Sequence, residues 1–461
     1  MDFPSDSNLP TLVVACNTEQ MREYFQTLLR PDTKEAFEIT DCRLILLRYR
    51  RGFRCILHYE LDVLEISTGL LFTKWVAGTL YANQTKNRSR RKALNAASDI
   101  RESDVTGRKC FESVGLIPEV GMILQVFPYD RKLPGLQVLK SRFIPDLEKQ
   151  WINDLGSGNW FVEERSIEPK RWRLGLSAVL KYNISAREVV SEKRTQKHFY
   201  LKVFPRDQSQ SSFQLLSELW KLRAEGKLPF AIAKPVAYAD DIGAIAIEEA
   251  PGVTLQDLLA GKDDFHQEAI QLAQALAAFH QTDFPMPRRH LLHDEYQRME
   301  RVSMRLEAVC PDLGKDIREI LDGVVQNLSD GPLGPAHLDL KTDHIFFHDN
   351  CVGLIDFDSC ATSDPMLDLA LLLARFSKAS DLFGISTNRP RIFVHTFLRQ
   401  YFSNTPSIWS QRLPFYYAWG LLKVATFFFN HLKPEWRNEI TNLIGEARES
   451  LSGKTWFSAD C

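Results

Sequence analysis

Two carboxylates that flank a short apolar hairpin are the residues of this chain best suited to chemistry. The segment 336–358 reads AHLDLKTDHIFFHDNCVGLIDFD. Asp339 precedes an apolar run at 345–347, and Asp356 ends a second run that begins at 352. An antiparallel hairpin would make the two carboxylates neighbours, although 17 positions separate them in the chain. Phosphoryl transfer uses such a pair, because one carboxylate orients and deprotonates the acceptor hydroxyl while another holds Mg²⁺ against the phosphates.

The residues around this pair resemble the aminoglycoside phosphotransferase and choline kinase group of protein-kinase-like enzymes. The family motif H-G-D-x-H-x-x-N is matched by His337 to His344, HLDLKTDH, and the element I-D-[FW]-[DE] by Ile355 to Asp358. Three further pieces follow the family order: EEAPGVTL at 248–255, LAQALAAFH at 272–280 and DPMLDL at 364–369. The ordered set, which spans about residues 170–400, is far more specific than any single piece.

The resemblance implies roles in the catalytic segment. Asp339 would be the catalytic base, Lys341 would offset charge on the transferring phosphoryl group, and Asp356 would bind Mg²⁺. His344 stands where the family has Asn, a second Mg²⁺ ligand. A neutral imidazole binds metals, but Mg²⁺ prefers oxygen, so that either one metal suffices or activity is reduced. Leu338 replaces the family's glycine.

The resemblance also implies a nucleotide side for ATP. Lys202 in YLKVF would pair with the α- and β-phosphates, and Glu218 in LLSELWKL would hold Lys202 by an ion pair. Adenine would meet backbone groups of the hinge residues Glu248, Glu249 and Ala250. The hairpin expected over the nucleotide, with its turn at 183–186, contains no glycine, so that close approach to phosphate is harder.

The elements that must position these residues form a β-rich first half and a helical second half. The first half predicts a hairpin around Gly52 and later strands, then a linker, then a second hairpin with further strands. The predicted elements are strands within 43–61, 70–81 and 115–127, a linker over 156–171, a hairpin over 173–190, a strand over 199–204, a helix over 213–224 and a strand over 244–249. The repeated order, with Lys74 corresponding to Lys202, predicts an internal duplication of about 100 residues.

From residue 256 onward the apolar period is helical, as in the amphipathic run 265–280. We therefore expect an α+β, protein-kinase-like two-lobed fold, with an antiparallel-sheet N-lobe, a helical C-lobe and an extra N-terminal β-rich domain. The expected domains are 1–155, which could be a degenerate second N-lobe, 156–250 as the kinase-like N-lobe, and 251–461 as the helical C-lobe with the catalytic loop.

The amino-acid composition limits the classes of binding partner that are expected. The 461 residues carry 57 Lys and Arg against 59 Asp and Glu, a net charge of −2, which argues against a nucleic-acid or membrane-surface binder. The basic run 86–92 is expected to be a solvated loop. Eight cysteines without a C-x-x-C pair fit a reducing cytoplasm, and no signal peptide or membrane span is expected. Oligomeric state cannot be inferred from the sequence.

The predicted function is ATP- and Mg²⁺-dependent transfer of the γ-phosphoryl group to a hydroxyl of a small molecule: a sugar, an aminoglycoside or an amino-alcohol. A protein acceptor is disfavoured because no A-P-E segment follows Asp358. The alternative is a catalytically weak or inactive kinase-like protein that binds nucleotide or acts as a scaffold. His344 and the hairpin without glycine support that alternative, and the intact Asp339, Lys341 and Asp356 oppose it.

Overall fold

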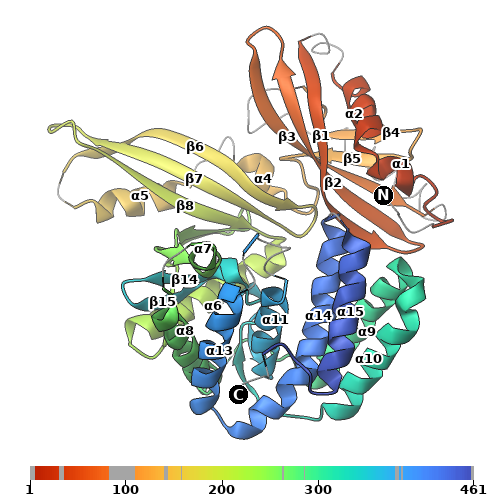
Figure 1. Ribbon diagram of the computed structural model, residues 1–461. Coiled ribbons are helices and arrows are strands. Elements are labelled where there is room, and N and C mark those ends of the chain that lie inside the picture. The colour runs from red at the N-terminus through yellow and green to blue at the C-terminus, as the bar shows by residue number, and fades with distance from the viewer. Residues whose placement is uncertain are drawn as a thin grey trace. The chain divides into compact units, whose positions relative to one another are not determined.

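The computed structural model of the protein describes residues 6–30, 36–82, 110–139, 144–156, 158–261, 264–284, 286–378, 384–385, 388–433 and 435–457. The expected basic loop at 86–92 lies outside these residues. The chain forms two compact units (Figure 1). The first unit combines Met1–Phe213, Pro235–Glu249 and Asn430–Leu432, and the second combines Gln214–Lys234, Ala250–Phe429 and Lys433–Cys461. The three-domain division at 155 and 250 stays a prediction.

The first unit is built on two five-stranded antiparallel sheets. The first sheet has the order β1-β2-β3-β5-β4, with β1 (Phe37–Arg50), β2 (Arg54–Glu65), β3 (Leu70–Tyr81), β4 (Val114–Ile117) and β5 (Met122–Val126). The second has the order β6-β7-β8-β11-β10, with β6 (Trp160–Arg173), β7 (Ser177–Glu188), β8 (Arg194–Val203), β10 (Pro235–Ala239) and β11 (Ala244–Glu248). Its helices are α1 (Leu12–Cys16), α2 (Thr18–Thr27), α4 (Gly135–Val138) and α5 (Pro145–Asp154), and α6 (Arg206–Ala224) begins in it.

The two sheets repeat one topology. In each, a hairpin is extended by a third antiparallel strand, the fifth strand pairs with the third, and the fourth strand pairs with the fifth. Two short helices precede each hairpin. This repetition agrees with the predicted internal duplication, although the period is about 124 residues, as the contacts at the two hairpin turns show.

A buried aspartate holds each hairpin turn in the same way. Asp6 Oδ2 accepts hydrogen bonds from the backbone N–H of Gly52 (2.8 Å) and the hydroxyl of Tyr49 (2.9 Å). Asp130 Oδ2, 124 positions later, accepts from the N–H of Gly175 (2.7 Å) and the indole N–H of Trp172 (3.1 Å). Each aspartate begins the same pattern, D-x-x-L-P-x-L, at 6–12 and 130–136. Each turn glycine has positive φ, +65° and +70°, which is the conformation that favours glycine.

The position of the turn at Gly175 corrects two expectations. Residues 160–173 form β6 and are not a linker, and residues 183–186 lie within the continuous strand β7. The hairpin therefore turns between Arg173 and Ser177, and its turn does contain a glycine. Asn183 lies between two apolar runs of β7 and is a residue type common in turns, which suggested a turn there. In the structure it is part of the strand and pairs across the sheet with Ser166.

The strand register also corrects the match of Lys74 with Lys202. Lys202 pairs with Val179, four positions beyond the turn glycine Gly175. The residue at the same place in the first sheet is Thr79, which pairs with Ile56, four positions beyond Gly52. Lys74 pairs with Leu61, further along the same two strands. The first sheet thus has a threonine where the second has the lysine expected to meet phosphate.

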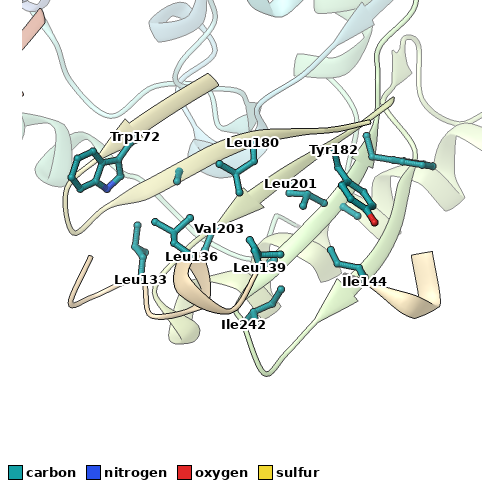
Figure 2. Close-up of a cluster of buried hydrophobic side chains, with 14 of the residues drawn as sticks. Leu133, Leu136, Leu139, Ile144, Trp172, Leu180, Tyr182, Leu201, Val203 and Ile242 are labelled. Atoms are coloured by element: carbon teal, nitrogen blue, oxygen red, sulfur yellow. The ribbon is translucent and has the colours of Figure 1, made fainter. Parts of the chain in front are cut away.

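A shared apolar core joins these elements of the first unit. It combines residues of the first sheet, such as Ile56 and Ala77, with residues of the second sheet and of the segment that connects them. Figure 2 shows Leu133, Leu136 and Leu139 beside Leu180, Leu201 and Val203 of the second sheet. An added Cβ at Gly135 would lie 2.0 Å from the carbonyl oxygen of Ile242, so that only glycine permits α4 to pack this closely.

The second unit is mainly helical and carries two small sheets. Its helices are α7 (Leu255–Ala260), α8 (His266–His280), α9 (Leu292–Val309), α10 (Gly314–Asn327), α11 (Met366–Phe376), α13 (Asn388–Ser403), α14 (Leu413–Asn430) and α15 (Trp436–Leu451), with short 3₁₀ turns η1 (Pro311–Leu313), η2 (Thr342–His344), η3 (Phe357–Ser359) and η4 (Ser407–Arg412). One sheet has the order β12-β14-β15-β9, from β12 (Val253–Thr254), β14 (Ile345–His348), β15 (Cys351–Leu354) and β9 (Ala231–Ile232). The other pairs β13 (Gly334–Ala336) with β16 (Ala361–Ser363). The α+β class with an additional N-terminal β-sheet is confirmed.

We predict that Asp130→Ala lowers the free energy of unfolding by about 2–4 kcal/mol, because it leaves the N–H groups of Gly175 and Trp172 without their acceptor. Asp6→Ala should cost a similar amount, since its carboxylate has the equivalent donors. Glu119→Ala, at an exposed position of the same unit, is the control and should stay within about 0.5 kcal/mol of wild type. Denaturant unfolding followed by circular dichroism measures all three, and equal stability of Asp130→Ala and the control would contradict the role of the aspartate.

Candidate active site

Two loops of the second unit carry the catalytic motif. The loop 337–344 connects β13 to β14, and the loop 355–360 connects β15 to β16. β14 and β15 form an antiparallel hairpin in which Ile345 pairs with Leu354. Asp339 stands before this hairpin and Asp356 after it, in the arrangement that the apolar runs predicted.

The hairpin brings three potential metal ligands together. One ligand atom from each of Asp339, His344 and Asp356 lies within 4.8 Å of the others. His344 Nε2 is 3.6 Å from Asp356 Oδ2. Lys341 Nζ donates to Asp339 Oδ2 at 2.7 Å. The structure therefore gathers all four residues that the sequence assigned to the catalytic and metal roles in the second unit.

The protonation states follow from burial and from these neighbours. Burial would raise the pKa of Asp339, but the charge and hydrogen bond of Lys341 hold it below the usual value, so the carboxylate is ionised at neutral pH. Burial lowers the pKa of His344 to about 4, and the positive charge of Lys341 acts in the same direction. His344 is consequently a neutral imidazole at neutral pH, with a nitrogen lone pair available to a metal ion.

The donor set fits a divalent cation. Asp339 and Asp356 supply hard carboxylate oxygens, which suit Mg²⁺. The imidazole of His344 suits softer ions such as Mn²⁺ or Zn²⁺ better, and its Nδ1 atom is buried without a hydrogen-bond partner among the described residues. The two carboxylates are therefore the residues of this cluster best matched to Mg²⁺.

A buried carboxylate outside the motif fixes the backbone of the catalytic loop. Asp368, at the start of α11, is fully buried and accepts hydrogen bonds from the backbone N–H groups of His337 and Leu338, each at 2.6 Å. Its Oδ2 also lies 3.2 Å from His280 Nε2, and His280 Nδ1 lies 2.7 Å from the hydroxyl of Tyr401. The sequence marks Asp368 only as part of the matched piece DPMLDL, and no motif marks Tyr401.

Further contacts tie the two catalytic loops to each other. His337 Nε2 lies 2.9 Å from the carbonyl oxygen of Ile355, and the Ile355 N–H donates to the carbonyl of His344 at 3.1 Å. Phe357 is buried between the rings of His337 and Phe230. The backbone around Asp339 and the backbone around Asp356 are therefore held together as one body.

Two residues of these loops adopt left-handed backbone conformations. Leu338 has φ +62° and Asp356 has φ +69°. The family has glycine at the position of Leu338, and the observed φ explains that preference, because a side chain makes this conformation costly by about 1–3 kcal/mol. The two short hydrogen bonds that Asp368 accepts from the backbone N–H groups of His337 and Leu338 favour the strained loop here.

Of the nucleotide-side residues, Lys202 lies on β8, Glu218 on α6 and Glu248 at the end of β11, and Glu249 and Ala250 follow that strand. Lys202 is half-buried in β8, and Glu218 is exposed on α6. Side chains of the hinge engage neighbouring strands: Lys197 Nζ is 2.7 Å from Glu248 Oε1, and Tyr200 donates to Glu249 Oε1 at 3.1 Å. These contacts use side chains, so they do not test the prediction that backbone groups of Glu248, Glu249 and Ala250 bind adenine. That role and the ion pair of Lys202 with Glu218 stay predictions.

Comparison with known proteins supports the resemblance. Residues 183–411 match the family described as "Phosphotransferase enzyme family". This match confirms the resemblance to the aminoglycoside phosphotransferase group that the motifs predicted. Both catalytic loops and the strand that carries Lys202 lie inside the matched region.

Individual relatives are similar over parts of the chain. A homoserine kinase from Granulibacter bethesdensis is 37% identical over 79 residues, 17% of this chain and 25% of the relative. A homoserine kinase from Methylobacterium nodulans is 37% identical over 108 residues, 22% of this chain and 34% of the relative. The chain thus spans a quarter to a third of the length of these curated relatives.

Solved structures of this group are similar at low identity. A putative aminoglycoside phosphotransferase from Ralstonia eutropha has 14% identity and a TM-score of 0.44, over 68% of this chain and 98% of that one. A choline/ethanolamine kinase family protein from Mesorhizobium loti has 15% identity and a TM-score of 0.41, over 60% and 87% of the two chains. Among the described residues, no helix has the length and hydropathy to cross a membrane.

We predict that Asp368→Asn lowers the free energy of unfolding by about 2–4 kcal/mol at pH 7, because an amide cannot accept from two N–H groups as a carboxylate does. Burial would raise the pKa of Asp368, but His280 and the loop N–H of His337 hold it below the usual value. The stabilisation is therefore full above the unfolded pKa of about 3.9 and is lost as the pH falls through the lower native value. Urea titrations between pH 3 and pH 7 should show the difference from wild type shrinking only below about pH 4.

The exposed Asp283→Asn substitution serves as the control, and Tyr401→Phe, which removes only the hydroxyl beside His280, tests the same network more mildly. A difference that grows as the pH falls, or that equals that of the control, would contradict this role of Asp368.

Proposed function

We propose that this protein is a phosphotransferase that moves the γ-phosphoryl group of ATP to a hydroxyl of a small molecule. The observation that carries the proposal is the cluster of Asp339, His344 and Asp356, with Lys341 paired to Asp339. The match of residues 183–411 to a phosphotransferase family supports it. Sugars, aminoglycosides and amino-alcohols are candidate acceptors, and homoserine joins them because two relatives are homoserine kinases.

Each residue of the cluster has a distinct task in this proposal. Asp339 orients the acceptor hydroxyl and takes its proton as the new O–P bond forms, while the bond from the γ-phosphorus to the β–γ bridging oxygen breaks and ADP leaves. Lys341 occupies Oδ2 of Asp339, so Oδ1 is the oxygen that faces the hydroxyl. The ammonium of Lys341 also offsets negative charge on the phosphoryl group in flight. Lys202 would hold the α- and β-phosphates.

A divalent cation would be held by Asp356, with Asp339 and His344 beside it. Mg²⁺, when bound, would neutralise part of the negative charge of the nucleotide phosphates. The strained backbone of Asp356 directs its carboxylate toward His344, and the contacts of Ile355 with the other loop keep it there.

The second candidate is a kinase-like protein that binds nucleotide with weak or no turnover. One specific observation favours it: His344 stands where an oxygen ligand of Mg²⁺ is expected. The other support, a nucleotide-covering hairpin without glycine, is removed, because the turn of that hairpin contains Gly175. Nucleotide binding without turnover on any acceptor would favour this second candidate.

We predict that Asp339→Asn lowers kcat by about 10²–10⁴-fold with little change in nucleotide affinity, since this side chain acts on the acceptor. Coupled ADP-release assays measure turnover, and isothermal titration with ATP and Mg²⁺ measures binding. Asp349→Asn, an exposed position in the β14–β15 turn, is the matched control. Full turnover of Asp339→Asn would remove the proposed base.

We predict that ATP raises the thermal unfolding midpoint of the wild type only in the presence of a divalent cation, and that Asp356→Ala abolishes this dependence. Binding to the folded state at a hundredfold excess over Kd corresponds to about 2.7 kcal/mol. His344→Asn, which restores an oxygen ligand, should shift the preference from Mn²⁺ toward Mg²⁺. The same shift in wild type and Asp356→Ala would place the metal elsewhere.

A further inference from the structure

Two cations of the second unit lie near the proposed base without an anionic partner. Arg375 lies in the last turn of α11, and Lys423 lies in α14. Both side chains are half-buried, and neither makes a hydrogen bond or an ion pair with any residue that the structure describes. The charge of Asp339 acts on both of them.

Close helix packing places the two cations in one region. An added Cβ at Gly420 of α14 would lie 2.8 Å from the carbonyl oxygen of Ala370 and 3.2 Å from the Cβ of Ala374, both in α11. Arg375 directly follows Ala374, and Lys423 is one helical turn beyond Gly420 on the same face. The glycine therefore lets α11 and α14, which carry the two cations, approach closely, and the charge of Arg375 acts on Lys423.

The electrostatics of Lys423 show how little anionic charge is available. Burial lowers the pKa of Lys423 to about 7, and repulsion from Arg298 and Arg375 adds to the effect. Glu295 and Asp339 act in the opposite direction without overcoming it. Lys423 is therefore only partly protonated at neutral pH, and an anion bound beside it would favour the charged ammonium form.

Two of the nearby carboxylates, Glu295 and Asp339, are already engaged. Glu295 is buried and accepts hydrogen bonds from the indole N–H of Trp419 and from His290. Asp339 is paired with Lys341 at 2.7 Å. Asp343, which is exposed, also attracts Arg375. A bound carboxylate would add the direct anionic partner that both cations lack among the described residues.

We propose that the acceptor is an anionic hydroxy compound, whose carboxylate binds Arg375 and Lys423 while its hydroxyl faces Asp339. This inference rests on the proposed function. A guanidinium binds a carboxylate through two parallel hydrogen bonds, and the ammonium of Lys423 adds a second charge. A polycationic acceptor such as an aminoglycoside would meet two like charges at this place, which disfavours it.

Two matched series of acceptors test the proposal. Glucuronate, glucose and glucosamine share one ring and differ in charge, and 4-hydroxybutanoate, butane-1,4-diol and 4-aminobutan-1-ol share one chain. We expect the carboxylate member of at least one series to have the highest kcat/KM by tenfold or more, and to bind in titration calorimetry without nucleotide. A preference for the neutral or ammonium member in both series overturns the proposal.

Variants assign the preference to the two cations. Arg375→Gln and Lys423→Met should each raise KM for the carboxylate acceptor by about tenfold to a hundredfold, with kcat and the neutral acceptor much less affected. Arg391→Gln, at an exposed position of α13, is the control. A preference for carboxylate that survives both variants overturns the proposal. Lys423→Met still tests the idea if Arg375→Gln does not fold.

The two proposals fail in distinguishable ways. Binding of a carboxylate acceptor that depends on Arg375 and Lys423, without phosphoryl transfer from ATP, supports the anion site and contradicts the phosphotransferase activity. Transfer from ATP to neutral or cationic acceptors only supports the activity and overturns the anion site. Binding of ATP with none of the six acceptors bound overturns an anionic acceptor of this kind.

Discussion

The carboxylate of Asp368 is the interaction on which the catalytic segment of the second unit depends. A fully buried charge costs several kcal/mol unless its oxygens are satisfied, and here two backbone N–H groups and His280 satisfy them. These hydrogen bonds also hold Leu338 in a left-handed backbone conformation, which is unfavourable for a leucine. Asp339 is the next residue, so its direction follows from that strained backbone. Asp368, which is far from Asp339 in sequence, thus orients the side chain of the proposed base through the backbone of Leu338.

The first unit uses the same physical device twice. Asp6 and Asp130 each accept hydrogen bonds from a turn glycine and from an aromatic side chain three positions before it. Burial would raise the pKa of Asp6, and the hydrogen bonds from Gly52, Tyr49 and Asn8 hold it below the usual value. Hydrogen bonds to the charged form therefore stabilise the folded turn at neutral pH. The sheets diverge at one informative place, where Thr79 occupies the position of Lys202.

The catalytic hairpin could be predicted because its apolar runs are short and bounded by polar turns. Helix α8 could be predicted because its amphipathic pattern extends over 265–280. The hairpin at Gly175 could not, since β6 is rich in charged residues and carries Pro169, which resembles a linker. The place of Lys202 depends on strand register, which a one-residue shift in either strand would change. Asp368 contacts His280 of α8, and His280 in turn contacts Tyr401 of α13; these residues are far apart in sequence, and no local pattern reveals the contacts. The close approach of α11 and α14, which carry the two cations, could not be predicted for the same reason. It depends on Gly420, whose contacts with α11 exist only in the folded protein.

The repeated D-x-x-L-P-x-L pattern indicates where the two copies of the duplicated sheet are joined. Each copy begins with the aspartate that later caps its own hairpin, so the turn at Gly175 depends on a residue at 130 that lies before α4 and α5. A fragment that begins at 156 would carry the second sheet without the acceptor for its turn, whereas one that begins just before Asp130 would be self-sufficient in this respect. The natural joint between the copies therefore lies in the few residues after β5. A gene-fusion or exon boundary placed there would separate the two sheets, and each sheet would keep the aspartate that binds its own hairpin turn.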